Sequence, residues 1–256
     1  MDTAPAIRHK RADAGRHHFG GRCMKGLTRQ INDLQNRIRK SVHALCGGAF
    51  PGDDDPFLIR LDAVTLFAED KPYARYHYQG KVITTLPGVI PHSEATVSQL
   101  KIEAMRQRIK EGADWRDTRL FREYYAQQLR DKGRAKGATT LDALDAVYRT
   151  EYDGLIRSIR DTGFDWSPEA EMYVHVLDDG AFCWTSGGNH RLGVALALGL
   201  AEIPVRIRFR TRRWQHHRLS LARAIRRGTL SLDDLPDHPD LRGIRRLHAP
   251  VGSHPA

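Results

Sequence analysis

The sequence holds few cysteines and no long apolar segment, and both shortages exclude classes of protein. Only Cys23, Cys46 and Cys183 stand among 256 residues, and no two of them form a CxxC pair. An odd number without regular spacing argues against the disulfide framework of a secreted domain. The longest apolar run, residues 192–201, contains two glycines and is about half as long as a membrane span. No apolar stretch typical of a signal peptide occurs in the charged first 20 residues, so we expect a cytoplasmic protein without a membrane partner.

Acidic residues are scarce at both ends of the chain. Residues 1–50 hold 10 Lys and Arg against 3 Asp and Glu, a net charge of +7, and residues 205–256 hold 12 Arg against 4 Asp, a net charge of +8. Residues 51–204 carry 19 basic and 24 acidic residues, a net charge of −5. Basic ends either contact a polyanion such as nucleic acid or anionic lipid, or serve solubility, and the composition leaves both interpretations open.

The hydrophobic pattern predicts an α+β chain in which a mostly helical region precedes a small mixed sheet with helices in the C-terminal half. A strand is expected at residues 58–66, followed by helices within 94–133. The sequence predicts five parts: a disordered basic arm (1–22), an amphipathic helix (23–50), a strand plus helical region (57–140), an α+β domain (141–230) and a tail (231–256).

The expected α+β domain begins with a helix that ends at Gly163. After this helix the hydrophobic pattern changes from helical spacing to the alternation typical of strands. Residues 171–177 and 181–185 read as two strands joined by the turn Asp178-Asp179-Gly180, a typical hairpin signal. A helix at residues 190–199, a strand at 203–210 and a basic amphipathic helix at 212–227 follow. The order of these elements predicts a small mixed sheet.

The junction before the helix at residues 190–199 reads Gly187-Gly188-Asn189-His190-Arg191. The first N–H groups of a helix lack internal partners and carry the positive end of its dipole. Glycines allow a ligand to approach the backbone, an arginine matches phosphate oxygens, and a histidine supplies a donor or a general acid near neutral pH. The junction is therefore either a phosphate site or a glycine-rich turn that Asn189 caps and that carries a surface His-Arg pair.

Other candidates for function lie on both sides of this junction. The alternation of Arg206, Arg208 and Arg210 predicts three guanidinium groups on one strand face, where they would contact phosphate or nucleic acid. Trp184 and Trp214 are expected in the core. No metal site is predicted, because His17, His18 and Cys23 have no fourth ligand at a suitable spacing.

The run GGNHRLGVALALGLAEIPVRI, after the hairpin and the preceding YDGLIRSIRDTGF, resembles the ParB/sulfiredoxin superfamily over residues 150–210. The resemblance implies a ParB/sulfiredoxin-like fold in which Gly188, His190 and Arg191 contact nucleotide phosphates, with Gly187 and Asn189 as backbone donors. Related kinases use an acidic residue as the base on a hydroxyl group, which makes Glu151 a candidate catalytic residue beside His190. The wider chain is similar to an uncharacterised bacterial and archaeal family that shares Trp115, Thr118 and an Arg-Trp-Gln tail.

Departures from the superfamily pattern narrow the expected activity. Sulfiredoxins have a catalytic cysteine where this chain has Asn189, and Cys183 lies on the preceding strand, so reduction of cysteine sulfinic acid is not expected. About 45 residues follow the last strand, too few for the helix-turn-helix and dimerisation domains of partition proteins. The resemblance implies binding of a nucleoside triphosphate with Mg²⁺, in a nucleotide-dependent switch or a phosphotransferase. The alternative is a nonspecific DNA-binding or nuclease-like protein that uses its basic termini.

Overall fold

A computed structural model describes Phe50, Asp53 and residues 55–69, 81–164 and 172–248. These residues all belong to one compact unit, His43–Ala256. The predicted basic arm at 1–22 and the amphipathic helix at 23–50 lie outside the described residues, apart from Phe50.

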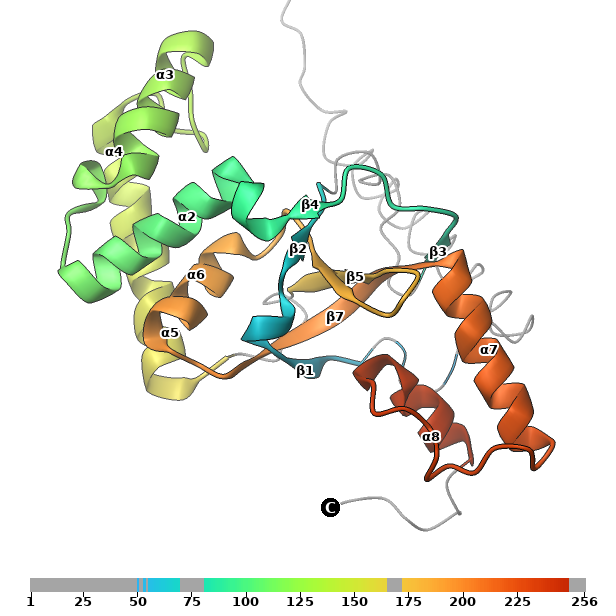
Figure 1. Cartoon of the computed structure of the whole chain (residues 1–256). Helices are drawn as coiled ribbons and strands as arrows, with labels where there is room; N and C mark the ends of the chain where they lie inside the picture. Colours follow the sequence, from blue (N-terminus) through green and yellow to red (C-terminus); the bar gives the residue numbers. More distant parts are fainter. Residues whose placement is uncertain (1–49, 51–52, 54, 70–80, 165–171, 249–256) are drawn as a thin grey trace, which may run out of the picture. The chain divides into compact units, whose positions relative to one another are not determined.

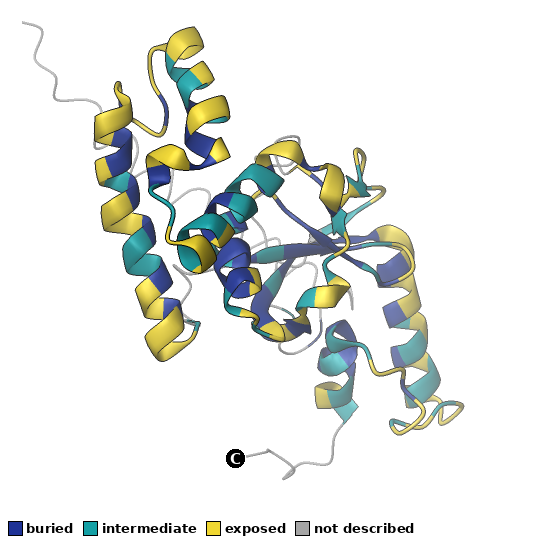
Figure 2. Cartoon of the chain, turned by 60° about the vertical axis from the view of Figure 1, so that its left-hand side comes forward, coloured by how far each residue is buried: buried dark blue, intermediate teal, exposed yellow. Residues whose placement is uncertain are grey.

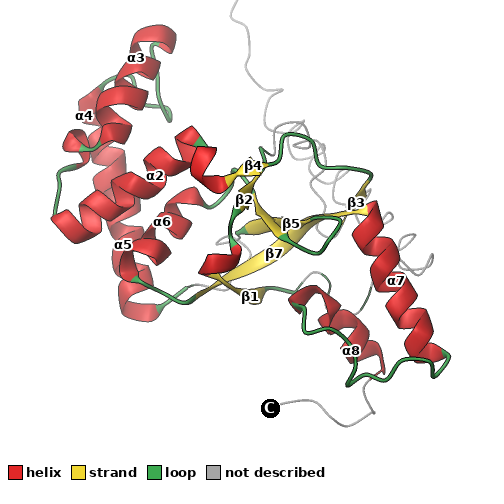
Figure 3. Ribbon diagram, viewed as in Figure 1, coloured by secondary structure: helices red, strands yellow, loops and turns green. Residues whose placement is uncertain are grey.

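The described residues form a mixed α+β fold around a seven-stranded sheet (Figure 1 and Figure 3). Along the sheet the strands follow the order β1-β7-β5-β6-β2-β4, and β3 pairs with the far end of β7. β7 pairs antiparallel with β1 and parallel with β5 and β3. The strands are β1 Phe57–Arg60, β2 Leu66–Phe67, β3 Lys81–Ile83, β4 Ile90–Pro91, β5 Tyr173–Val176, β6 Phe182–Trp184 and β7 Glu202–Thr211.

The hairpin between β5 and β6 is confirmed. The two strands pair antiparallel, and the Leu177 N–H group donates to the Ala181 carbonyl at 2.9 Å across the turn. Gly180 has φ +92°, a conformation that glycine adopts without strain. The Asp-Asp-Gly signal therefore placed two neighbouring strands of the sheet correctly.

The helices gather in two groups, with α2 to α6 beside one end of the sheet and α7 and α8 beside the other (Figure 1). We call α2 to α5, with the turns between them, the helical layer. Its continuous segments contain π-helical turns, at Gln107–Glu111 after α2, Leu120–Tyr125 before α3 and Tyr148–Tyr152 between α4 and α5. The helices are α2 Thr96–Arg106, α3 Ala126–Lys132, α4 Leu141–Val147, α5 Asp153–Thr162, α6 Asn189–Leu198, α7 Arg212–Arg226 and α8 Arg242–His248, with short 3₁₀ turns at Leu61–Ala63, His92–Glu94, Trp115–Asp117 and Pro239–Leu241.

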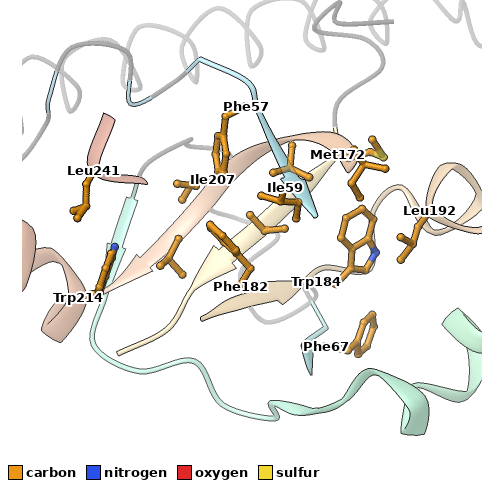
Figure 4. Packing of buried hydrophobic residues seen from close by; sticks show 14 of the residues in the cluster. Phe57, Ile59, Phe67, Met172, Phe182, Trp184, Leu192, Ile207, Trp214 and Leu241 are labelled. Carbon is orange, nitrogen blue, oxygen red and sulfur yellow. The ribbon is translucent and has the colours of Figure 1, made fainter. Parts of the chain in front are cut away.

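Two hydrophobic cores hold these elements together. The first lies on the sheet and includes Phe57, Ile207, Trp184 and Trp214 (Figure 4). The second lies inside the helical layer, where aromatic side chains pack around Tyr148. In α5 and α7 the buried residues follow one side of the helix and the exposed residues the other (Figure 2), as amphipathic helices require. Both tryptophans at 184 and 214 are buried, as the sequence predicted.

α6 links the two cores, because Leu192 and Ala195 belong to the first and Val194 to the second. It lies close against α2: a Cβ atom built on Gly193 would stand 2.9 Å from the Ile102 Cα atom. A glycine at this position therefore lets the helical layer approach α6 directly.

The structure corrects three boundaries. The segment expected as a tail from residue 231 packs on the sheet core through Leu235, Leu241 and Ile244. The expected border at residues 140 and 141 does not separate two domains, because β1 and β2 pair with β7 and β6 across it. The strand expected at 58–66 is split by the 3₁₀ turn Leu61–Ala63. In the first two cases the deciding contacts are distant in sequence and leave no local periodicity.

Candidate functional site

The predicted junction forms the turn from β6 into α6. Gly188 is the N-cap of α6 with φ +77°, and no side chain caps the helix. The Gly187 N–H group donates to Thr185 Oγ1 at 3.2 Å. The first intrahelical bond runs from the Leu192 N–H group to the Gly188 carbonyl at 2.9 Å. The earlier N–H groups of α6 have no partner inside the helix, so they supply donors and the positive end of the helix dipole.

The Asn189 side chain belongs to the core and not to a ligand site. It is 4% exposed, and its Oδ1 atom accepts from Ser98 Oγ at 2.8 Å and Trp184 Nε1 at 2.9 Å. Its Nδ2 atom donates to the Ser186 carbonyl at 3.0 Å. The interpretation of Asn189 as the N-cap is wrong, because Gly188 holds that position. The backbone N–H group of Asn189 is the part that a ligand can use.

Gly188 is a glycine for a different reason from the one the sequence suggested. A Cβ atom built on it would lie 2.9 Å from Met172 Cγ and 3.4 Å from Trp184 Cζ2, both in the core. Its positive φ also disfavours any other residue. At Gly187, by contrast, a Cβ atom would meet only Thr185 Oγ1 at 3.6 Å. Gly187 is therefore the glycine at which backbone approach by a ligand can be tested.

His190 is held between two tyrosines of the helical layer. Its Nε2 atom lies 3.2 Å from the Tyr148 hydroxyl, which in turn lies 2.6 Å from the Tyr125 hydroxyl. The His190 and Tyr152 rings stand 4.2 Å apart between centroids. Burial, together with the charges of Lys101, Lys136 and Arg191, lowers the pKa of His190 to about 2. The imidazole is therefore neutral near pH 7 and does not carry the extra proton that a general acid would donate.

Lys136 approaches His190 from a loop of the helical layer. Its Nζ atom donates to the Tyr152 hydroxyl and lies 4.8 Å from the centroid of that ring. Its φ of +47° makes it the non-glycine residue with positive φ in the described part of the chain. Such a conformation is uncommon outside glycine, asparagine and aspartate. The fold therefore keeps an ammonium group beside His190 in a backbone conformation that lysine seldom adopts.

Arg191, the second predicted phosphate ligand, is half-buried and makes no hydrogen bond or ion pair with any residue that the structure describes. We define the α6 site as the backbone of Gly187 to Arg191 with the side chains of Lys101, Lys136, His190 and Arg191. The sequence did not indicate the two lysines, because they belong to distant elements, α2 and the loop after α3, and no short motif connects them to the junction. The charges that act on His190 within the described residues are all positive.

Glu151, the candidate base, is exposed, and its side chain makes no hydrogen bond or ion pair with any described residue. The pKa of Tyr148 is raised mainly by burial, and the negative charge of Glu151 adds a minor contribution in the same direction. The neighbouring Asp153 is engaged structurally: its Oδ2 accepts from Arg108 Nη2 at 2.7 Å and its Oδ1 from Trp115 Nε1 at 3.0 Å. Of these two acidic residues, neither Glu151 nor Asp153 is placed to take a proton at the α6 site.

The prediction that Arg206, Arg208 and Arg210 share a strand face is wrong. Ile207 pairs with Val174 and Phe209 with His175, so Arg208 is an extra residue in β7. One extra residue reverses the faces beyond it, which turns Arg210 to the opposite side from Arg206. Arg206 and Arg208 are half-buried, and their contact with phosphate stays a prediction.

Arg210 is not available to phosphate, because it is 1% exposed and ion-paired. Its Nη2 atom donates to Asp240 Oδ1 at 2.6 Å. Trp214 Nε1 donates to Asp240 Oδ2 at 2.7 Å, and Arg218 joins Asp240 to Asp53. We call Arg210, Arg218, Asp53 and Asp240 the buried ion network. Two guanidinium groups meet two carboxylates there, so the network is neutral and serves the fold.

Metal and membrane features are absent from the described residues. They contain no group of three or more His, Cys, Asp or Glu side chains that could hold a metal ion. None of their helices is both long and apolar enough to cross a bilayer. Comparison of the chain with protein-family models, curated proteins and solved structures gave no match. The case for a function therefore rests on the chemistry of the chain itself.

Proposed function

We propose that the protein binds the phosphate groups of a nucleoside triphosphate at the α6 site. The observation that carries this proposal is a uniformly positive environment at the start of a helix. Lys101, Lys136 and Arg191 act on a neutral His190, and Arg191 has no partner in the described residues. Guanidinium groups match phosphate oxygens with two parallel hydrogen bonds, and the helix start adds N–H donors. The resemblance of residues 150–210 to the ParB/sulfiredoxin superfamily supports the same ligand.

Binding, rather than catalysis, is the function that this geometry supports best. The neutral imidazole of His190 and the N–H groups of α6 donate hydrogen bonds, and Lys136 adds charge from the helical layer. Glu151, the candidate base, is exposed and makes no hydrogen bond or ion pair with His190 or Arg191. A nucleotide-dependent switch therefore fits the free protein better than a phosphotransferase, which would need Glu151 to move towards the ligand. A cytoplasmic location, where nucleotides are supplied, belongs to the proposal.

Mg²⁺ would be held by the nucleotide and not by the protein. The side chains of the α6 site are nitrogen donors, whereas Mg²⁺ prefers oxygen ligands. The described residues offer no acidic cluster for a metal ion. Bound Mg²⁺ would neutralise part of the triphosphate charge. The chain's own task is then to orient the remaining oxygens with Arg191, Lys136 and the helix start.

Calorimetric titration of the full chain with CTP, ATP and ADP in the presence of Mg²⁺ tests the proposal. Arg191→Ala should abolish binding while thermal unfolding stays unchanged, and Arg191→Lys should restore it only in part because an ammonium group cannot grip two oxygens. Arg122→Ala is the matched control, since Arg122 is exposed on the helical layer. Failure of the wild-type protein to bind any nucleotide, or full binding by Arg191→Ala, would overturn the proposal.

Gly187→Val tests the backbone contact separately. Among the described residues, Thr185 Oγ1 at 3.6 Å is the one heavy atom near the Cβ position of residue 187, so a side chain there has room. It should therefore weaken nucleotide binding without unfolding the chain. Gly188→Val is not informative, because its side chain would collide with Met172 and Trp184 in the core. Wild-type affinity in Gly187→Val would show that the N–H groups of the turn do not touch the ligand.

A further inference from the structure

α7 exposes a row of arginines that nothing on its own helix neutralises. Residues 212–227 contain no Asp or Glu. At about 100° per residue, the five exposed arginines fall within an arc of about 140° on one side of the helix. We call this side the outer face of α7, and its residues are Arg212, Arg213, Arg223, Arg226 and Arg227.

The side chains of four of these arginines make no hydrogen bond or ion pair with any residue that the structure describes, namely Arg213, Arg223, Arg226 and Arg227. The fifth, Arg212, donates to the neutral Thr84 Oγ1 at 3.0 Å. Arg212 and Arg213 also lie in the first turn of α7, which has no acidic residue. Cations at that end oppose the helix dipole, so folding alone does not explain them.

The rest of α7 fixes the direction of this face. Trp214 and Ala222 lie in the sheet core, and Arg218 is held in the buried ion network. The helix cannot turn its arginines inward without breaking these contacts. None of the exposed large hydrophobic residues of the described chain lies on α7. A helix that binds a membrane surface needs an exposed apolar face. The outer face of α7 therefore fits a polar polyanion better than a membrane surface.

We propose that the outer face of α7 docks on the phosphate backbone of a nucleic-acid duplex. The 15 residues of α7 span about 22 Å. A duplex carries one phosphate charge per about 1.7 Å of its axis, so phosphates are available along the whole row. Guanidinium groups grip phosphate oxygens in pairs. Phosphate contacts carry no base information, so this binding is nonspecific, and it uses a surface separate from the α6 site.

Fluorescence anisotropy of a labelled duplex of about 20 base pairs, with the full chain and without nucleotide, tests this surface. The test variant combines Arg213→Gln, Arg223→Gln and Arg227→Gln. The control combines Arg106→Gln, Arg119→Gln and Arg122→Gln, which removes the same charge from arginines paired with carboxylates on the helical layer. Circular dichroism should show that both variants fold.

The α7 variant should bind roughly tenfold more weakly near 0.1 M salt, and its salt slope should fall by about 2.7, which is about 0.9 for each lost phosphate contact. The control should keep the wild-type slope. Equal losses in both variants would show an effect of net charge alone and overturn the proposal. So would a wild-type protein that does not bind the duplex, or one that binds anionic phosphatidylserine vesicles through these arginines instead.

Discussion

The helical layer and α7 both expose many arginines, but most of those in the helical layer pair with carboxylates, whereas those on the outer face of α7 do not. The pairs of the helical layer join helical turns, as Arg119 does with Glu123 at 2.9 Å, and join separate elements, as Arg108 does with Asp153 at 2.7 Å. On α7 the inner face is neutralised by the buried ion network, while the outer face has no carboxylate. Six arginines of the helical layer are paired in this way, Arg106, Arg108, Arg116, Arg119, Arg122 and Arg149.

The difference shows that net charge alone does not locate a binding surface. A carboxylate beside an arginine neutralises the positive charge of that arginine. An exposed pair of this kind contributes only about 0–1 kcal/mol to stability. An arginine without such a partner keeps its field for an external anion. By this criterion the outer face of α7 gathers such arginines in a row on one helix, and Arg191 is another at the α6 site. The helical layer has four more exposed arginines without a carboxylate partner among the described residues, but they are spread over α3, the loop after it and α5, namely Arg130, Arg134, Arg157 and Arg160. The variants below test this contrast.

The largest effect is expected at the buried ion network. Asp240 is 2% exposed and accepts from Arg210 and Trp214. Asp240→Asn leaves Arg210 and Arg218 with Asp53 as their remaining carboxylate, and an uncompensated buried charge should lower the free energy of unfolding by about 3–5 kcal/mol. Urea unfolding of the variant and the wild-type protein measures this loss of free energy. In the control, Asp117→Asn, the carboxylate is 63% exposed and pairs with Arg122, so a loss below about 1 kcal/mol is expected. Equal losses would remove the distinction between buried and surface pairs.

The next largest effect concerns the positive field at the α6 site. The folded-state pKa of His190 is lowered to about 2 by burial and by Lys101, Lys136 and Arg191, whereas the unfolded value is about 6.5. The unfolded chain thus binds a proton that the folded chain rejects between these values. Because only the unfolded chain takes up this proton, the free energy of unfolding is highest above pH 6.5. It decreases as the pH falls, by up to about 2.7 kcal/mol at pH 4.5.

Urea unfolding from pH 7 to 4.5 measures this linkage. Burial also lowers the pKa of His92 and of His238, so these two described histidines contribute to the wild-type slope together with His190. His190→Gln should remove the contribution of His190 and flatten the slope. Exposed His216, changed to Gln, is the control. An unchanged slope in His190→Gln would mean that His190 is not held neutral by the fold.

Local signals in the sequence were sufficient for the elements around the candidate site. The hairpin turn, the glycine that ends α6 and the apolar run of β7 predicted neighbouring elements within one or two residues of their observed ends. These features depend on residues close in sequence. The expected phosphate ligands His190 and Arg191 also follow from a contiguous run, and the structure places both at the start of α6.

Contacts between distant residues could not be predicted in the same way. The Asn189 side chain is held by Ser98, 91 residues away, so no local pattern shows that it serves the core. The bulge at Arg208 depends on pairing with β5, and without it an alternating pattern wrongly predicts one arginine face. Lys136 reaches His190 from a loop between α3 and α4. Each of these errors concerns which partner a polar side chain finds, which composition and periodicity do not contain.

A third prediction tests whether packing, and not charge, holds the helical layer to α6. In Gly193→Ala the new Cβ atom would lie 2.9 Å from Ile102 Cα and 3.0 Å from Met105 Cβ. Overpacking of this kind typically lowers stability by about 1–3 kcal/mol, against a gain of about 1 kcal/mol in helix propensity. Gly154→Ala in α5 is the matched control, because its Cβ atom would meet nothing within 4 Å and should only stabilise. A midpoint temperature of thermal unfolding that rises in both variants would show that α2 and α6 are not in close contact.

The smallest expected effects decide between a structural and a functional origin for the α7 arginines. Arg122→Gln breaks an exposed pair with Asp117 and should lower the free energy of unfolding by at most about 1 kcal/mol. Arg213→Gln should act in the opposite direction and raise it by about 0.3–1 kcal/mol, because Arg213 opposes the dipole in the first turn of α7 and has no carboxylate beside it. Both effects should shrink in about 1 M salt, where the Debye length falls to about 3 Å. If Arg213→Gln instead destabilises the protein, the arginine contributes to the fold, and its exposure no longer argues for a bound polyanion. If it stabilises the protein, the fold tolerates an unfavourable charge at the position where a phosphate backbone would neutralise it.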